Sequence, residues 1–187
     1  MFGARESMVD VPTHHLIYGT LNDFITGEEI SDTDDERFRQ DLSRMLVNDL
    51  GYRKEELKPR RFIETLFSAQ FVRSNIELAV TLRTKTFLII RYAPGSLVSR
   101  ERGAIAAARV LEKEYQIPLA IVTNGRDAEL IDTGNKNILA TGMEAIPSRD
   151  EAEKMLPDLV FRDAPEGKKR EGELRILNAF DVQICCR

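Results

Sequence analysis

The fold is decided by residues 73–123, RSNIELAVTLRTKTFLIIRYAPGSLVSRERGAIAAARVLEKEYQIPLAIVT. Residues 76–82 alternate between apolar and other side chains with the period of two that a half-buried strand requires. The apolar members, which we expect to share one face, are Ile76, Leu78, Val80 and Leu82. Residues 86–92 form a nearly continuous apolar run, which favours a central strand. With a short turn at 83–85, the two segments predict a β-hairpin.

The second half of this stretch predicts a helix and a buried strand. Ser99 is a suitable N-cap for a helix over 100–115, and inward-facing alanines such as Ala104 and Ala108 favour close packing on a sheet. Residues 117–123 are apolar and β-branched, as in a buried strand. A strand, a helix and a strand in this order favour a right-handed crossover, and therefore a parallel pairing within a mixed sheet.

The flanking sequence supplies further elements. Thr33 and Glu36 have the spacing of a capping box and precede an apolar stripe, which predicts a helix over 34–50, and residues 60–67 alternate as a strand does. After the central stretch the sequence predicts a hairpin (128–132 with 137–141), a short helix from a capping box at Ser148 and Glu151 to about 155, a polar linker (163–172) and a docked helix or strand (173–184). The expected organisation is an N-terminal arm (1–30), a domain (31–156) and a C-terminal linker with a docked segment (157–187).

The composition is that of an ordinary soluble protein with one core, because 42% of the 187 residues are hydrophobic and 31% are charged. No apolar run approaches the roughly 20 residues that span a bilayer, and the first residues lack the apolar segment of a signal peptide. We therefore expect a cytoplasmic protein without membrane contact. The sequence contains no glycine-rich phosphate loop, so nothing in it indicates a nucleotide cofactor.

The net charge of −4 is unevenly distributed. Residues 1–52 carry 4 Lys and Arg against 11 Asp and Glu, residues 53–113 carry 13 against 6, and residues 114–187 carry 10 against 14. A basic central third can mark a surface that faces a polyanion, because Lys and Arg make the phosphate contacts. The alternative is that these charges are solvated on several faces or paired with the acidic N-terminal third.

Cysteine and histidine give little support for a metal site. Cys185 and Cys186 are adjacent and nearly terminal, and vicinal cysteines bond to each other only with strain, so we expect reduced thiols. His14 and His15 have no acid or cysteine at ligand spacing.

Several segments resemble the N-terminal domain of the type I restriction enzyme R subunit (HsdR). They are the acidic start of the first helix (32–40), Leu50-Gly51-Tyr52, LIIRYAPGS (88–96) and IPLAIVTNG (117–125), within about 27–142. The resemblance implies an α/β fold of the restriction-endonuclease-like, PD-(D/E)xK class, with an αβββαβ core, a mixed central sheet flanked by helices and a trailing β-hairpin. Members of that superfamily hold Mg²⁺ with an acid on the second core strand and with a Glu-x-Lys pair on the third.

The catalytic motif implied by the resemblance is degraded in this chain. Relatives typically carry Glu-x-Lys before Ala-Pro-Gly, but the Glu position is Ile90 and the Lys position is Tyr92. Glu77 is the only carboxylate near the first acid position, which makes it a weak metal candidate, and Tyr92 has an ordinary pKa near 10 and carries no positive charge at pH 7. Arg91 is cationic, but strand alternation places it on the opposite face from Ile90 and Tyr92. Relatives also tend to carry a glutamine where residues 103–108 are small.

Three functions remain open on this basis. The first is a catalytically inactive nuclease fold that binds nucleic acid, such as duplex DNA, or assembles a complex, with Arg91, Arg100 and Arg102 flanking the turn where relatives bring the scissile phosphate. The second is a Mg²⁺-dependent DNA endonuclease with a rearranged acid set, which would require carboxylates such as Glu36, Glu64 and Glu77 to converge. The third is a domain that contacts protein partners or a second copy of itself and has no nucleic-acid ligand.

Overall fold

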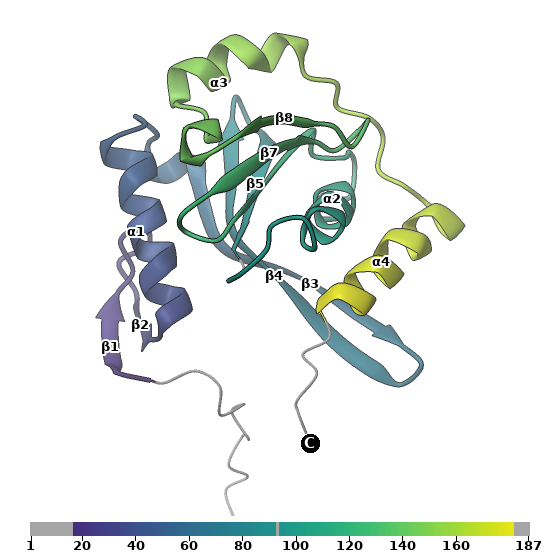
Figure 1. The fold of residues 1–187 in the computed structure, drawn as a ribbon, viewed down its shortest axis with the longest axis horizontal. Helices are drawn as coiled ribbons and strands as arrows, with labels where there is room; N and C mark the ends of the chain where they lie inside the picture. Colours follow the sequence, from purple (N-terminus) through teal and green to yellow (C-terminus); the bar gives the residue numbers. More distant parts are fainter. Residues whose placement is uncertain (1–16, 93, 182–187) are drawn as a thin grey trace, which may run out of the picture.

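The computed structural model describes residues 17–92 and 94–181, and its centre is a six-stranded sheet (Figure 1). In spatial order the strands are β3 (Leu57–Phe67), β4 (Gln70–Leu82), β5 (Lys85–Tyr92), β6 (Leu119–Thr123), β7 (Ala128–Asp132) and β8 (Ile138–Thr141). Strands β5 and β6 are parallel, and the other neighbouring pairs are antiparallel. The expected mixed sheet with a trailing hairpin is therefore confirmed.

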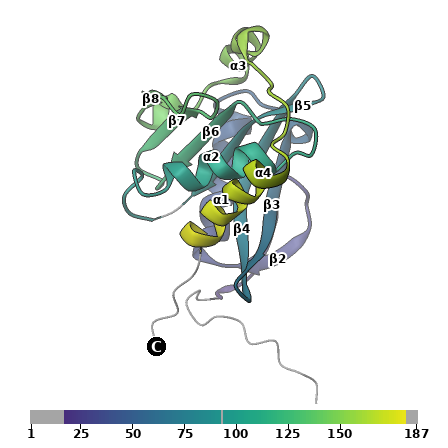
Figure 2. The same cartoon turned by 90° about the vertical axis from the view of Figure 1, so that its right-hand side faces the viewer.

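Helices cover both faces of the sheet (Figure 2). α1 (Asp34–Asn48) packs on one face through an apolar cluster that includes Leu46, Leu88 and Ile90. α2 (Glu101–Val110) and α4 (Gly167–Asp181) pack on the other face through a cluster that includes Ile89 and Leu177. The order α1, β3, β4, β5, α2, β6 is the predicted αβββαβ core. Shorter helical segments are α3 (Arg149–Met155) and the 3-10 turns Lys54–Glu56, Met143–Ala145 and Leu156–Asp158.

Two tight turns fix the register of the central hairpins. The loops Ser68-Ala69 and Arg83-Thr84 each contain two residues, all with positive φ angles (51° and 62°, 46° and 75°). Two consecutive left-handed residues form the turn whose twist matches that of the flanking strands. The turn expected at 83–85 is thus present, although Lys85 already belongs to β5.

One expectation about β4 is wrong. Leu78, Val80 and Leu82 belong to the cluster beneath α1, but Ile76 belongs to the cluster beneath α2 and α4. The change of face occurs where β4 passes Arg60, because the register of β3 and β4 places Arg60 between the pairs Pro59–Leu78 and Arg61–Ile76. Arg60 has a φ angle of 55°, which interrupts the regular pleat, and a local backbone irregularity of this kind cannot be read from a pattern of hydrophobicity.

The helix termini agree with the sequence in part. Thr33 Oγ1 accepts the N–H of Glu36 at the start of α1, and Ser148 and Glu151 form the expected capping box of α3. The N-cap predicted for α2 is wrong, because Ser99 Oγ donates to the carbonyl of Ser96 and the helix begins at Glu101 without a side-chain cap. α2 also ends at Val110, short of the predicted residue 115. Beyond it, Tyr115 turns back toward the sheet and its hydroxyl accepts the N–H of Thr86 (2.9 Å).

The polar run 163–172 is a linker only as far as Glu166, because α4 begins at Gly167. Charged side chains of the first two turns of α4 have partners on α2. Arg170 donates to the carbonyl of Val110 at the end of that helix (3.2 Å), and Glu173 accepts from Arg109 (2.7 Å). These contacts stabilise a helix from Gly167 onward, where composition alone indicated a loop.

Residues 17–32 contain a second, smaller sheet, which is formed by β1 (Gly19–Asn22) and β2 (Glu29–Asp32) in antiparallel register. The turn between them carries Asp23 and Phe24 against α1, where Phe24 N–H donates to Gln40 Oε1 (2.7 Å). This hairpin crosses residue 30, at which the N-terminal arm was expected to end.

None of the helices in residues 17–92 and 94–181 has the length and hydrophobicity that a bilayer crossing requires. His14, His15, Cys185 and Cys186 lie outside the described residues, as does Ala93 of the Ala-Pro-Gly turn.

Candidate functional site

The candidate site lies where the parallel strands β5 and β6 end side by side. The register pairs Tyr92 with Thr123, the last residues of the two strands. The loops that follow are joined, because Asn124 Nδ2 donates to the carbonyl of Gly95 (3.0 Å). Gly125 has a φ angle of 84°, and a Cβ on it would lie 3.1 Å from the Phe38 ring of α1. The Thr-Asn-Gly and Pro-Gly turns therefore form one rigid edge of the site.

A cleft of about 340 Å³ opens at this edge. β4, β5, the N-terminal turns of α1 and α2, and the C-terminal turn of α4 all contribute to its walls. Its charged lining residues are Asp35, Arg73, Glu77, Arg91, Arg100 and Asp181. The cleft thus brings together acids and arginines from five separate segments, at the position where the family resemblance places a catalytic centre.

Glu77 is buried at the base of the cleft. Only 6% of its surface is exposed, and its Oε2 accepts the backbone N–H of Tyr92 (2.9 Å). Burial raises the pKa of Glu77, and this effect outweighs the N–H of Tyr92 and the charges of Arg91 and Arg39, which lower it. The carboxylate therefore fixes the end of β5.

The two motif positions on β5 face the α1 side of the sheet. Ile90 is fully buried in the apolar cluster beneath α1. The Tyr92 ring stacks on Phe38, with ring centroids 3.9 Å apart and an interplanar angle of 23°. Burial, and then the charges of Asp35, Asp34 and Glu77, raise the pKa of Tyr92 further above its ordinary value of 10. These positions supply one aliphatic side chain and one neutral phenol.

The carboxylates proposed for a rearranged metal site point elsewhere. Glu36 forms an ion pair with Arg39 and accepts from Gln40 Nε2 (2.9 Å), whereas Glu64 lies on β3 opposite Arg73. Across residues 17–92 and 94–181, no three His, Cys, Asp or Glu side chains are grouped as a metal ion requires. Mg²⁺ is held by carboxylate oxygens that converge on the ion. Glu36, Glu64 and Glu77 do not converge, so they do not fit a Mg²⁺ site.

Arg91 points to the opposite face from Ile90 and Tyr92, as strand alternation predicts. Its Nη2 donates to both carboxylate oxygens of Asp181 on α4 (3.0 and 3.1 Å), and its Nε donates to the carbonyl of Asn75 (3.0 Å). A Cβ on Gly103 would lie 3.2 Å from Arg91 Nη1 and 3.7 Å from Phe180 Cβ. The small residue on α2 therefore leaves room for the guanidinium and for the last turn of α4.

Arg100 and Arg102 lie at the start of α2 and are both exposed. Arg100 lines the cleft, and the Arg102 guanidinium lies over the Phe180 ring, 5.5 Å from its centroid. Within the described part of the chain, neither arginine forms an ion pair with a carboxylate. They are therefore the cations at this edge that a ligand can reach without displacing an acid.

Sequence reasoning missed the contribution of α4 to the site. Asp181 and Phe180 contact two of the three arginines that were predicted to bind nucleic acid. The apolar pattern of the last segment indicated only that this segment docks on the domain. A local pattern cannot predict an ion pair between residues 90 positions apart.

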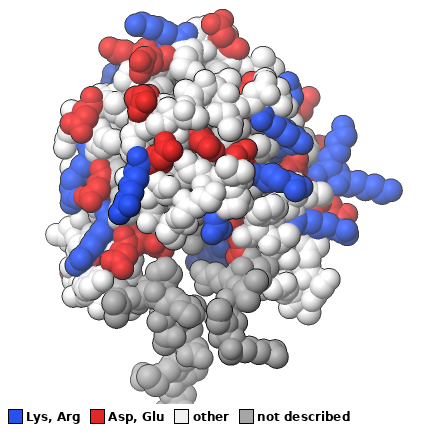
Figure 3. Space-filling view, viewed as in Figure 1, with Lys and Arg blue, Asp and Glu red and all other residues white. Residues whose placement is uncertain are grey.

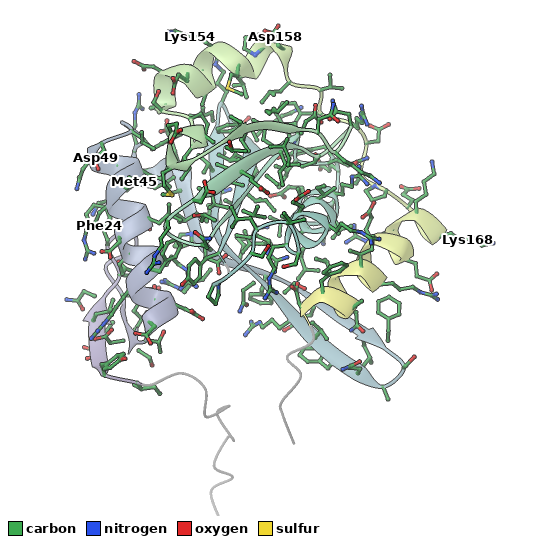
Figure 4. The ribbon with its side chains drawn as sticks, in the orientation of Figure 1. Phe24, Met45, Asp49, Lys154, Asp158 and Lys168 are labelled. Carbon is green, nitrogen blue, oxygen red and sulfur yellow. The ribbon has the colours of Figure 1, made fainter. Side chains whose placement is uncertain are left out.

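The basic central third of the sequence does not become a uniformly basic surface. Arg60 pairs with Asp23, Arg83 pairs with Glu153 (2.8 Å), and Arg109 pairs with Glu173 (2.7 Å). Figure 3 shows Lys and Arg interspersed with Asp and Glu over the face in view. Lys168 extends into solvent at the N-terminal end of α4, the end opposite Asp181 (Figure 4). The positive charge accessible at the cleft is therefore limited to a few arginines.

Comparison with protein families supports the resemblance found in the sequence. The family model for the type I restriction enzyme R protein N terminus matches residues 34–147, more than half of the chain, and this region extends from the start of α1 to the residue before the Ser148 cap of α3. No curated protein and no solved structure matches the chain. The matched region contains the whole αβββαβ core and excludes the β1–β2 hairpin and α4. The chain belongs to the family of type I restriction enzyme R protein N-terminal domains.

Proposed function

We propose that this domain binds nucleic acid at the cleft without cutting it. The observation that carries the proposal is the occupancy of the two motif positions on β5, where Ile90 is buried in the core and Tyr92 stacks on Phe38. Metal-dependent cleavage needs carboxylates to hold the cation and a group that assists the attacking water. At the motif positions only Glu77 carries a carboxylate, and it is buried and bonded to a backbone N–H, so the motif supplies neither.

The arrangement of arginines supports nucleic acid as the ligand. Arg73 and Arg100 line the cleft, and Arg102 lies two residues further along the exposed start of α2. Arginine binds phosphate through a planar set of donors, and nucleic-acid affinity depends mainly on such contacts. Asp181 of the same cleft offsets little of the charge on these arginines, because it is paired with Arg91.

Cleavage is tested with supercoiled plasmid in the presence of Mg²⁺ or Mn²⁺, comparing the natural chain with Glu77→Ala. We expect no nicking by either protein. Nicking by the natural chain that disappears in the Glu77 variant would refute the non-catalytic part of the proposal.

Binding is tested by fluorescence anisotropy of a labelled DNA duplex at increasing salt. The double variant R100Q/R102Q should bind more weakly and show a shallower salt dependence, by about 0.9 in the slope for each phosphate that is no longer neutralised. A matched control is R44Q/R175Q, which removes the same charge from exposed ion pairs on α1 and α4. Equal weakening in both double variants would show that only net charge matters and that the cleft is not the binding site.

A further inference from the structure

The hairpin of β3 and β4 extends beyond the rest of the sheet (Figure 1) and has two very different faces. Its inner face packs beneath α4, where Ile63, Thr65 and Val72 are buried. Asn178 of α4 anchors this face by donating to Thr65 Oγ1 (3.1 Å) and to the carbonyl of Gln70 (3.2 Å). The inner face of the hairpin is thus covered by α4, and its outer face is not.

The outer face exposes large apolar side chains, which is unusual for a soluble domain. Phe62 is 44% exposed, Leu66 is 66% exposed and Phe71 is 62% exposed. The register pairs Phe62 with Asn75, Glu64 with Arg73, and Leu66 with Phe71, so that all six residues lie on one face. The two phenylalanine positions are four residue pairs apart along the ribbon, or about 13 Å at the usual rise of a strand.

This face continues into the cleft without a break. Arg73 and Asn75 line the cleft and also belong to the outer face of the hairpin. The Arg73 guanidinium lies over the Phe62 ring, 3.6 Å from its centroid. Aromatic rings beside a guanidinium, on a ribbon next to the cleft proposed for the phosphates, are the components of the surfaces on which unpaired bases stack.

We propose that the outer face of the β3–β4 hairpin binds unpaired bases of a nucleic-acid strand whose phosphates lie in the cleft. The inference rests on the proposed function and adds its ligand class: a single strand, or a duplex with unpaired nucleotides. Phe62 and Phe71 stack with bases, and Arg73 contacts the backbone between them. Any base presents a ring face for such contacts, so the binding is expected to depend little on sequence.

The layout of the face favours bases over a protein partner. A protein interface is desolvated at a contiguous, mostly apolar centre. The middle of this face is instead the Glu64–Arg73 pair, whose side chains are half exposed and 3.7 Å apart, and it separates Phe62 from the Leu66–Phe71 pair. Rings that are separated by an ion pair fit successive bases of one strand better than they fit the continuous apolar centre of a protein interface.

The test compares the affinities for labelled oligo-dT and for a labelled duplex of the same length, measured by anisotropy. In the double variant F62L/F71L the rings are replaced while apolar area is retained. Its affinity for oligo-dT should fall by about 10-fold or more, within the range expected when base stacking is removed, and its affinity for the duplex should change by less than about twofold. The variant F62Y/F71Y keeps both rings and should bind oligo-dT like the natural chain.

The control variant is Phe24→Leu. The Phe24 ring also has a cation over its face, because Lys54 Nζ lies 3.9 Å from its centroid, but it lies beside α1 and away from the β3–β4 hairpin (Figure 4). It should leave both affinities unchanged. If F62L/F71L binds oligo-dT as tightly as the natural chain while duplex binding persists, the inference fails and the proposed function stands. If the natural chain binds neither nucleic acid, both fail. A dimer in light scattering that disappears in F62A/F71A, with oligo-dT binding unchanged, would assign this face to self-association and overturn the inference.

Discussion

The two segments that flank the family-matched core each bring an aspartate onto an arginine of the sheet, but the two ion pairs differ in their surroundings. The β1–β2 hairpin places Asp23 against Arg60 of β3, and α4 places Asp181 against Arg91 of β5. Asp23 is 2% exposed and accepts from four donors, which are the N–H groups of Ile25 and Thr26, the Gln40 amide and Arg60. Among the described residues, Asp181 is bonded by Arg91 alone, at the rim of the cleft.

The difference separates a hairpin that is part of the core from a helix that occupies an arginine of the cleft. Burial raises the pKa of Asp23, but the N–H of Thr26, the Gln40 amide and Arg60 outweigh it and hold the pKa at about 2. The groups that bond Asp23 join the hairpin to α1 and β3, and none of them lines the cleft. The Asp181 contact, in contrast, occupies an arginine that lines the cleft. We therefore expect changes at Asp23 to affect stability, and changes at Asp181 to affect binding.

Replacing Asp23 with alanine should have the largest effect on stability. It removes one acceptor from Arg60 and one from the buried Gln40 amide, each of which then keeps Glu36. Removal of one member of a buried ion pair typically costs about 3 kcal/mol. Urea unfolding followed by circular dichroism measures the change. The control is Glu28→Ala, because Glu28 is 70% exposed and only 3.5 Å from Arg60, and its cost should be below about 1 kcal/mol. Equal effects of the two substitutions would contradict the distinction.

The same network predicts a pH dependence with a defined sign. Because the pKa of Asp23 is lower in the folded state than its ordinary value of 3.8, ionised Asp23 favours folding. This contribution is present above pH 3.8 and is lost as the pH falls toward about 2. The difference in urea midpoint between the natural chain and Asp23→Asn should therefore shrink across this range. A difference that grows on acidification would show that Asp23 is not held ionised.

Asp181→Asn should lower stability by only about 1 kcal/mol, because it weakens one charge-assisted contact at the rim of the cleft. Its larger consequence concerns binding. Arg91 becomes available to a phosphate, so the affinity for a DNA duplex should rise and the salt slope should steepen by about 0.9. The control is Glu171→Gln, which removes the same charge from an exposed pair on α4. If Asp181→Asn binds DNA no more tightly than the natural chain, the idea that α4 keeps Arg91 from a phosphate is wrong.

Glu77→Gln should raise stability at neutral pH, because the neutral amide does not incur the cost of burying a charge. The pKa of Glu77 is raised in the folded state, so the natural chain loses stability as the pH rises through the ordinary value of 4.5 and up to the folded pKa, and the deficit is constant above it. The glutamine variant has no such loss. Thermal unfolding from acid to neutral pH should show the two proteins diverging above pH 4.5, and parallel curves would contradict the buried-acid description.

The smallest effect is expected for Gly103→Ala. Alanine favours a helix by about 1 kcal/mol over glycine, but the added Cβ would lie 3.2 Å from Arg91 Nη1 and must displace the guanidinium slightly from Asp181. The two effects nearly cancel, and the stability should stay within about 0.5 kcal/mol of the natural chain. The control is Gly172→Ala on α4, where no atom lies within 4 Å of an added Cβ, and a net gain is expected there.

The sequence predicted most of the core because its signals are local. The apolar run of β5, the crossover to β6 and the face of Arg91 relative to Ile90 and Tyr92 all follow from periodicity and connectivity. Ile76 was assigned to the wrong face because the unusual φ angle of Arg60, on the neighbouring strand, leaves no mark in the pattern.

The candidate site was predictable only in part, because α4 completes it from the other end of the chain. Glu77 of β4 and Tyr92 of β5 line the cleft together with Arg100, whereas Ile90 is buried in the apolar cluster beneath α1. The pairing of Arg91 with Asp181 depends on how α4 docks across α2, through contacts such as Arg109–Glu173. A contact of this kind is decided by tertiary packing, so the sequence could not indicate that Arg91, a candidate phosphate ligand, is paired with an acid.

The central claim, that the domain binds nucleic acid through a small set of cleft arginines, is tested most directly by the salt dependence of duplex binding. The affinity of the natural chain should fall linearly on logarithmic axes, with a slope of about −2 to −3 for two or three phosphate contacts. No detectable binding at low salt, or a slope near zero, would contradict the account.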